Sequence, residues 1–384
     1  MKYKSKLLYY VFGLTIIGFF FIAISSLSEA IGTGDKFYIL KKQSMWLIIS
    51  IIFLFIGSRI NLDFLKKNSF TFYIIANILL ALVLLPSLGN KALGARRWFS
   101  LGTIGIQPSE IFKLSAILFF PFLFCQENYR TIKNLLVYLG IPCLLILLEP
   151  NLSTTVLIAA IVMTVYYLSN AHYKSILIFT LISIVFFGLM SIAQPYRKAR
   201  IQTLINPDKN TATTSSYHSN QILYALSSGG LFGKGFANSD QKYKYLPKIS
   251  TDSILAIIGE ETGFIGISFI IILYLILILY LFKLSSQIKD NYQSLLIASI
   301  ACWITYQSLI NIGAIAAIIP LTGIPLPFIS YGGSSLTTLF FSIGLVLNIE
   351  KSNQNLLNSL NDTKNHSHRH SPYSRSRIHQ TTKE

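Results

Sequence analysis

Long runs of apolar residues, separated by short polar segments, dominate the chain. Runs of about 18 or more apolar residues are typical of helices that cross a membrane. The runs are continuous rather than alternating, so a transmembrane β-barrel is disfavoured. The pattern predicts ten membrane-spanning helices, at about residues 7–27, 43–60, 69–86, 108–125, 134–149, 153–169, 175–194, 254–281, 294–319 and 330–349.

The connections divide the chain into one membrane domain and one tail. The fifth and sixth runs are short and separated only by EPNLS, so they form either two crossings or a tight re-entrant pair. Residues 195–253 form the only long connection. Residues 350–384 are polar, basic and poor in apolar positions, which is typical of disorder. We therefore expect an all-α integral membrane domain over 1–349, with one long extracytoplasmic loop and a disordered basic cytoplasmic tail.

Composition agrees with a membrane protein. The chain is 52% hydrophobic and 12% charged, whereas soluble domains are about 25% charged. Its formal net charge is +17, but the basic residues flank the apolar runs and fill the tail, which indicates membrane topology rather than nucleic-acid binding. Lys and Arg gather in alternate short loops, which predicts that both termini are cytoplasmic.

The three cysteines are scattered in apolar segments and are expected to be ordinary core residues.

Lys and Arg are expected mainly in cytoplasmic loops. Two connections on the predicted outer side nevertheless carry positive charge. One contains GARRW, with Arg96 and Arg97, and the other is the long loop at 195–253. Either these charges are simply tolerated, or they form an electropositive surface for an anionic ligand. Composition alone leaves both interpretations open.

The fourth run opens with QPSEIFKL, which places two charges near membrane depth. A charge there costs at least about 2.5–3.5 kcal/mol, so it usually faces protein or water. Glu110 and Lys113 are three residues apart and share one helical face. They form either a structural ion pair or the wall of a polar cavity. Glu149, which ends the fifth run, has an equally open structural or functional role.

The segment KISTDSILAIIGEETGFIG places three carboxylates at the start of an apolar run. Along a helix, Asp252 and Glu260 would lie about 12 Å apart. The paired carboxylates of glycosidases are about 5–9.5 Å apart, so a two-carboxylate hydrolase is disfavoured here. We expect Asp252 to lie at the outer end of this membrane helix without a second carboxylate beside it, and Glu260 and Glu261 to lie deeper in the membrane.

The last outer turn, IIPLTGIPLPFISYGGSSL, breaks helical structure with three prolines and a glycine. Its Ser330, Gly332 and Gly333 allow the backbone to approach a partner or ligand closely, although a purely structural break is the alternative. The chain contains no HExxH, GxSxG or Walker motif.

Several blocks together resemble the SEDS family, the shape, elongation, division and sporulation proteins of the RodA/FtsW type. The blocks are GARRWFSLGTIGIQPSEIFKL, EPNLSTT, SSGGLFGKGF, QKYKYLP, TDSILAIIGEETGFIG and GIPLPFISYGGSSL. GARRW and QKYKYLP look more like the division branch than the elongation branch. The chain departs from the family pattern at Lys248, Ser250 and Ser253, where Glu, His and Phe are expected, and EETG replaces EELG.

The resemblance implies a ten-helix fold and the polymerisation of lipid II into peptidoglycan strands. It places the catalytic carboxylate in the Thr251–Asp252 pair, and it maps the polar membrane residues to Glu110 and Lys113 and the arginines to Arg96 and Arg97. It also implies a class B penicillin-binding protein and other division membrane proteins as partners, in the bacterial cytoplasmic membrane at the division septum. No covalently bound cofactor is expected.

The chemistry assigns roles to these residues. A carboxylate can accept the proton of an attacking sugar hydroxyl, which makes Asp252 the candidate general base. Arg96, Arg97 or a divalent cation, Mg²⁺ or Mn²⁺, could stabilise the departing pyrophosphate. Three alternatives stay open: a lipid II flippase, an elongation-type polymerase and a non-catalytic scaffold of the division machinery.

Overall fold

A computed structural model describes residues 5–29, 37–92, 95–102, 104–192, 194–205, 214–239 and 250–369. Within this part of the chain, seven helices are long and apolar enough to cross a membrane: α1 (Lys6–Glu29), α2 (Tyr38–Gly57), α5 (Pro108–Cys125), α8 (Tyr173–Ile192), α11 (Ile254–Gln287), α12 (Asn291–Ile315) and α13 (Gly333–Arg369). Three shorter apolar helices are α4 (Ser69–Val83), α6 (Ile132–Leu148) and α7 (Leu152–Leu168). Each of the ten expected spans overlaps one of these helices, so the predicted all-α membrane fold is confirmed.

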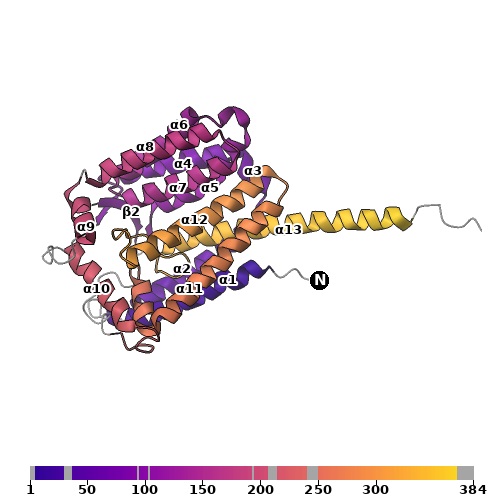
Figure 1. Ribbon diagram of the computed structural model, residues 1–384. Coiled ribbons are helices and arrows are strands. Elements are labelled where there is room, and N and C mark those ends of the chain that lie inside the picture. The colour runs from indigo at the N-terminus through magenta and orange to yellow at the C-terminus, as the bar shows by residue number, and fades with distance from the viewer. Residues whose placement is uncertain are drawn as a thin grey trace, which may run out of the picture.

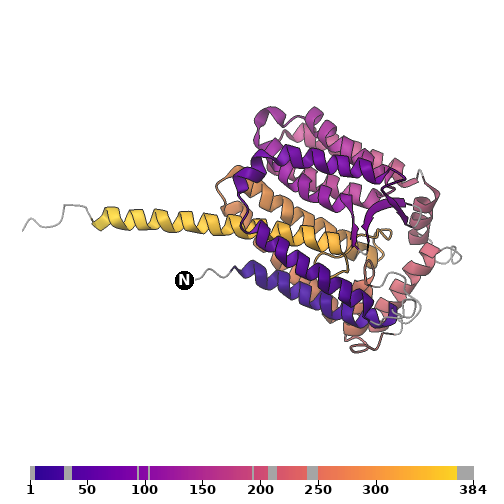
Figure 2. The same cartoon turned by 180° about the vertical axis from the view of Figure 1, so that it is seen from behind.

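The helices run side by side and give the bundle two ends (Figure 1). At the proximal end lie the N-terminus, the short helix α3 (Leu62–Lys67) and the point where α13 leaves the bundle. At the distal end lie three short strands and two further helices, α9 (Pro195–Ile205) and α10 (Thr214–Gly229). Turning the molecule around shows α1 and α2 covering the other side of α13 (Figure 2).

Burial separates central helices from peripheral ones. In the most apolar stretches of α5, α12 and α13, 78%, 67% and 83% of the residues are buried, against 6% in α8. The central helices also carry most of the buried polar side chains described below. The candidate site therefore lies among α5, α12 and α13, and α8 lies at the edge of the bundle.

The helices α6 and α7 correspond to the two short spans, which were expected to form either two crossings or a tight re-entrant pair. The Asn151 side chain accepts a hydrogen bond from the Thr154 N–H at 3.3 Å and so caps α7. Each helix has 17 residues and is about 26 Å long, which reaches the lower limit for a membrane-spanning helix. Two full crossings are therefore possible by length.

The connections at the distal end contain strands and helices, although the sequence predicted only loops there. Strands β1 (Asn90–Ala92), β2 (Ala95–Leu101) and β3 (Ile104–Ile106) form an antiparallel sheet in the order β1-β2-β3. The long connection contains α9 and α10, joined to α11 through residues that include QKYKYLP, which lie outside the described part of the chain.

The C-terminal segment differs from the disordered tail expected after residue 349. α13 continues as one helix to Arg369 and projects beyond the bundle (Figure 1). Polar residues replace apolar ones after Glu350, and a helix can continue through them because the segment contains neither glycine nor proline before Arg369. Residues 370–384 lie outside the described part of the chain.

Candidate functional site

Asp252 lies at the distal end, in the turn that precedes α11, and is half-buried. Its side chain faces Gly323 in the broken segment between α12 and α13. A Cβ on Gly323 would lie 3.3 Å from the Asp252 carboxylate oxygen Oδ2, and Gly323 has a φ of 71°. This positive φ favours glycine, and the missing side chain keeps the backbone of the broken segment close to the carboxylate.

A single side chain of α12 ties Asp252 to that broken segment. The Asn311 amide donates hydrogen bonds to the backbone carbonyl of Asp252 at 3.2 Å and to that of Ile324 at 2.8 Å. Asn311 is 2% exposed, so both bonds form away from bulk water. The amide therefore fixes the spacing between the start of α11 and the segment that follows α12.

One helical turn deeper, Gln307 repeats this arrangement. Its amide donates to the Pro325 carbonyl at 2.8 Å, and its Oε1 accepts from Lys113 Nζ at 3.1 Å and from Trp303 Nε1 at 2.6 Å. Residues four apart lie on one face of a helix, about 6 Å apart along its axis. Trp303, Gln307 and Asn311 therefore form a polar stripe on α12 that leads from Asp252 into the bundle.

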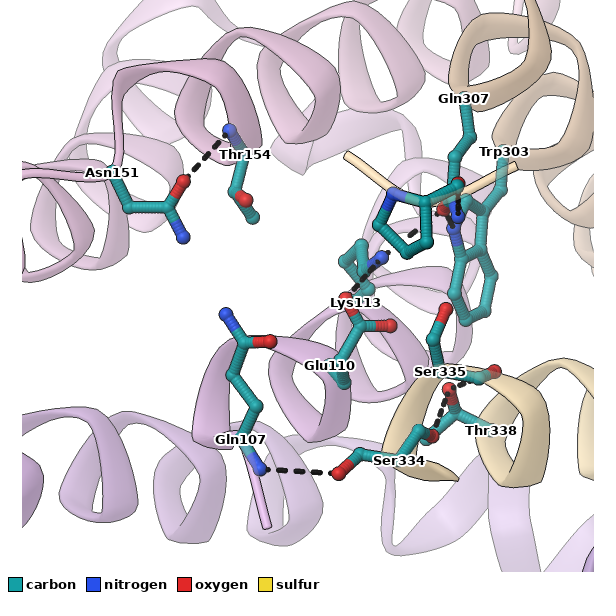
Figure 3. A network of polar contacts seen from close by, with 11 residues as sticks. Gln107, Glu110, Lys113, Asn151, Thr154, Trp303, Gln307, Ser334, Ser335 and Thr338 are labelled. Carbon is teal, nitrogen blue, oxygen red and sulfur yellow. Dashed lines mark hydrogen bonds and ion pairs between the residues drawn. The ribbon is translucent and has the colours of Figure 1, made fainter. Parts of the chain in front are cut away.

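The deeper end of this stripe meets the predicted Glu110–Lys113 pair (Figure 3). Lys113 Nζ lies 2.7 Å from Glu110 Oε1, and both side chains are almost fully buried. The same ammonium lies 4.9 Å from the centroid of the Trp303 ring, a distance at which a cation is attracted to an aromatic face. Within the described residues, Glu110 Oε2 has no hydrogen-bond partner, so one carboxylate oxygen is left for a water or a ligand.

The start of α13 adds hydroxyl groups to the same region. Ser334 Oγ accepts a hydrogen bond from the Gln107 N–H at 3.2 Å, just before α5 begins. Ser335 is the next residue and Thr338 lies about one turn further along α13 (Figure 3), and all three hydroxyl side chains are largely buried. Such a density of buried polar groups in a membrane helix indicates a polar interior rather than a lipid-facing wall.

The two predicted arginines of β2 are separated by the strand. Successive side chains of a strand point to opposite faces, so Arg96 and Arg97 lie on different sides of β2. Arg97 donates from Nε to the Glu149 carbonyl at 2.8 Å and from Nη2 to the Pro150 carbonyl at 2.6 Å. Arg97 thus holds the α6–α7 turn, and Arg96, which is half-buried, is the one that remains for a ligand.

Glu149 lies in the turn that Arg97 holds. It is fully buried, and neither carboxylate oxygen has a hydrogen-bond partner in the described part of the chain. Arg97 contacts the backbone carbonyl of Glu149.

Glu260 anchors the distal loop. Its carboxylate accepts hydrogen bonds from Ser239 and Ser228 and forms an ion pair with Lys234 at 3.0 Å. The backbone N–H of Gly235 donates to the Glu261 carbonyl at 3.0 Å. These contacts dock the loop at 230–239 onto α11, and they give the Glu260 carboxylate a structural role.

The remaining supporting residues shape the backbone around Asp252. Ser330 Oγ accepts from the Leu326 N–H at 2.9 Å and so closes a turn. Gly333 lies against the Trp46 ring of α2, where a Cβ would overlap the ring. Gly332 is less confined, and Thr251 is a half-buried neighbour of Asp252. In the SYGGSS segment, Gly333 therefore allows α13 to pack closely against α2. The less confined Gly332 is compatible with the approach of a ligand.

The donor set does not form a preassembled metal site. Among the described residues, no three His, Cys, Asp or Glu side chains are grouped closely enough to hold an ion. Glu110 is already paired with Lys113, and Glu260 is paired with Lys234. We therefore derive no catalytic step through Mg²⁺ or Mn²⁺.

Three residues of this region were not singled out from the sequence. Gln307 and Asn311 connect the predicted residues to one another, and His218 of α10 hydrogen-bonds Ser253 Oγ at 2.8 Å. A signal for the first two existed, since amides four residues apart inside an apolar helix share a face. No local pattern marked His218, which belongs to the long connection.

Comparison with known proteins agrees with this architecture. A family model described as "Cell cycle protein", covering FtsW, RodA and SpoVE, matches residues 5–355. The chain is 33% identical over 366 residues to "Probable peptidoglycan glycosyltransferase FtsW" of Escherichia coli O6:H1, covering 91% of this chain and 86% of that protein. It is 34% identical over 324 residues to "Stage V sporulation protein E" of Bacillus subtilis, covering 83% and 88% respectively.

Solved structures show the same fold. One chain of a peptidoglycan synthase complex, described as coordinating polymerization and crosslinking, superposes with a TM-score of 0.76 at 22% identity, covering 92% of this chain and 99% of that chain. The rod shape determining protein RodA of Thermus thermophilus gives a TM-score of 0.68 at 24% identity, covering 92% and 98%.

Proposed function

Because the chain belongs to the family of cell cycle proteins that includes FtsW, RodA and SpoVE, we propose that it is a peptidoglycan glycosyltransferase that polymerises lipid II. Two of its relatives, one of them from Taylorella equigenitalis, are named as probable enzymes of this class. The resemblance to the SEDS family is confirmed, and the protein is a multi-pass bacterial membrane protein. The distal end is proposed to face outward, where lipid II is used.

The reaction joins two sugars and releases a lipid pyrophosphate. The 4-hydroxyl oxygen of one sugar attacks the anomeric carbon of another, and the bond from that carbon to the pyrophosphate oxygen breaks. Asp252 accepts the proton of the attacking hydroxyl, and the pyrophosphate leaves with the electron pair of the broken bond. Arg96 belongs to β2 at the same end of the bundle, and we propose that it attracts the departing anion.

A single observation carries this proposal. A half-buried carboxylate at the distal end lies at the mouth of a buried polar stripe, and the Asn311 amide fixes its backbone against the broken segment before α13. A general base requires such fixed placement because proton transfer occurs only within hydrogen-bond reach of the reacting group.

The direct test uses the purified full-length protein with labelled lipid II, alone and with a class B penicillin-binding protein. Glycan ladders on a gel are the expected product. Movement of label across the membrane of liposomes, without ladders, would favour a flippase. Neither product in the presence of the partner would favour a scaffold.

The division role and the partner are finer proposals. Curated relatives named FtsW and one named for sporulation are about equally similar to this chain, so identity alone does not separate the branches. We propose septal synthesis because GARRW and QKYKYLP resemble the division branch. The proposed crosslinking partner is supported by the likeness to a chain of a peptidoglycan synthase complex. Depletion should produce filamentous cells, whereas an elongation-type enzyme would produce rounded ones.

Asn311→Leu should lower the polymerisation rate by roughly tenfold, equivalent to about 1.4 kcal/mol of barrier. The substitution leaves the carbonyls of Asp252 and Ile324 without their donor, and a lost hydrogen bond costs about 0.5–1.5 kcal/mol. Single-turnover ladder formation and lipid II binding should be measured together. The rate should fall while binding is retained.

Leu309→Ala is the matched control, because Leu309 lies on the same helix but is 59% exposed. It should polymerise at the wild-type rate. Equal losses of rate and binding in Asn311→Leu would point to general unfolding and would contradict a positioning role.

A further inference from the structure

A cavity lies at the proximal end, at the other end of the bundle from Asp252. Its volume is about 260 Å³, and it opens between the start of α1, the end of α2 and the adjacent part of α13. Figure 2 shows α1 and α2 side by side where α13 leaves the bundle. The cavity belongs to the opposite end of the membrane domain from the catalytic region, so glycan polymerisation does not explain it.

The polar lining of this cavity is cationic. Arg59 and Lys351 both contribute to its wall, together with the hydroxyl groups of Ser5 and Ser58. Within the described residues, neither the Arg59 guanidinium nor the Lys351 ammonium forms a hydrogen bond or an ion pair, and both residues are exposed. Two unpaired positive groups at one cavity favour an anion as its ligand.

Glu350, which precedes Lys351 in the chain, is engaged elsewhere. The Glu350 carboxylate accepts a hydrogen bond from Ser5 Oγ at 2.7 Å and another from the Tyr280 hydroxyl. It is 4% exposed and is absent from the cavity wall. Glu350 therefore holds α1, α11 and α13 together and does not neutralise Arg59 or Lys351 through a direct ion pair.

The apolar lining indicates what the anion is attached to. Leu8, Phe55 and Leu347 complete the wall, and Phe55 is 54% exposed on the outer surface of α2. A membrane helix presents such side chains to acyl chains. The cavity is smaller than the pockets of about 300–1,000 Å³ that enclose drug-sized ligands, so it suits a headgroup whose chains stay outside.

We propose that this cavity binds the phosphate headgroup of an anionic phospholipid from the leaflet at which α1 begins. Arg59 and Lys351 hold the phosphate, and the acyl chains run along Leu8 and Phe55. The inference goes beyond lipid II polymerisation and does not depend on it. Anionic lipids attract basic residues near a membrane surface at about 1 kcal/mol per residue, and a shaped cavity adds selectivity to that attraction.

The test is native mass spectrometry of the delipidated full-length protein with phosphatidylglycerol or phosphatidylcholine added. The wild type should retain phosphatidylglycerol at least about tenfold more tightly than phosphatidylcholine. Arg59→Gln combined with Lys351→Gln should remove this preference. The matched control is Lys283→Gln with Lys289→Gln, which removes two exposed cations at the same end of the bundle but outside the cavity.

Three outcomes would overturn the proposal. The cavity variant could keep the wild-type preference, or the control variant could lose it to the same extent, which would indicate diffuse surface attraction. Inorganic phosphate could displace phosphatidylglycerol completely, which would indicate a soluble anion. Polymerisation by the cavity variant within about twofold of wild type in one fixed detergent would show that it is folded.

Discussion

Asp252→Asn should lower glycan polymerisation by at least about 10²–10⁴-fold, the contribution of a well-placed general base. Asparagine has nearly the same shape as aspartate but cannot accept the proton of the attacking hydroxyl. The Asn311 hydrogen bond goes to the backbone carbonyl of residue 252, so it should survive the substitution. The measurement is ladder formation from lipid II by the purified variant, with thermal stability and partner binding measured on the same sample.

Asp290→Asn is the matched control, because it makes the same chemical change at the other end of the bundle. Asp290 caps α12 by accepting from the Gln293 N–H at 2.8 Å, and asparagine is an equally good cap. This variant should polymerise normally. If Asp252→Asn did so too, Asp252 would have no part in the mechanism.

Lys113→Met should destabilise the protein by about 3–5 kcal/mol and also abolish polymerisation. The substitution leaves the Glu110 carboxylate buried without its cation, and breaking one side of a buried pair has a cost of this size. Gln307 would also lose one of its partners. Thermal unfolding in detergent and ladder formation should both be recorded.

The double variant Glu110→Gln with Lys113→Met separates the two interpretations of this pair. Removing both charges should recover much of the stability, because no uncompensated charge remains. If the pair lines a cavity that handles substrate, activity should stay low despite the recovered stability. A double variant that polymerises at the wild-type rate would show that the pair is structural only.

Features that depend on residues close together in the sequence, such as the apolar helices, were predicted well. Continuous apolar runs marked all ten helices, because burial in lipid leaves a compositional signature along the chain. The Glu110–Lys113 pair was also predictable, since two residues three apart must share a helical face. Adjacency in sequence did not reveal that the two arginines of β2 have different surroundings. Arg96 and Arg97 point to opposite faces of a strand, and Arg97 binds a distant turn.

Long-range connections were the part that sequence did not reveal. Asn311 contacts Asp252 and Ile324, and Gln307 contacts Lys113, which is 194 positions away in the chain. No periodicity within one helix specifies which other helix it will face. Low hydrophobicity favours disorder after residue 349, whereas α13 extends to Arg369, because continuation from a membrane helix removes the cost of starting a new one.

The burial of α5 has a consequence for how the protein is made. α5 emerges from the ribosome long before α12, which supplies Gln307 and Trp303 to Lys113. During that interval α5 must enter the bilayer with two charged groups and no completed interior around them, at a cost of several kcal/mol if each were alone. Glu110 neutralises Lys113 from within the same helix, so the nascent segment carries its own counter-ion until its later neighbours arrive.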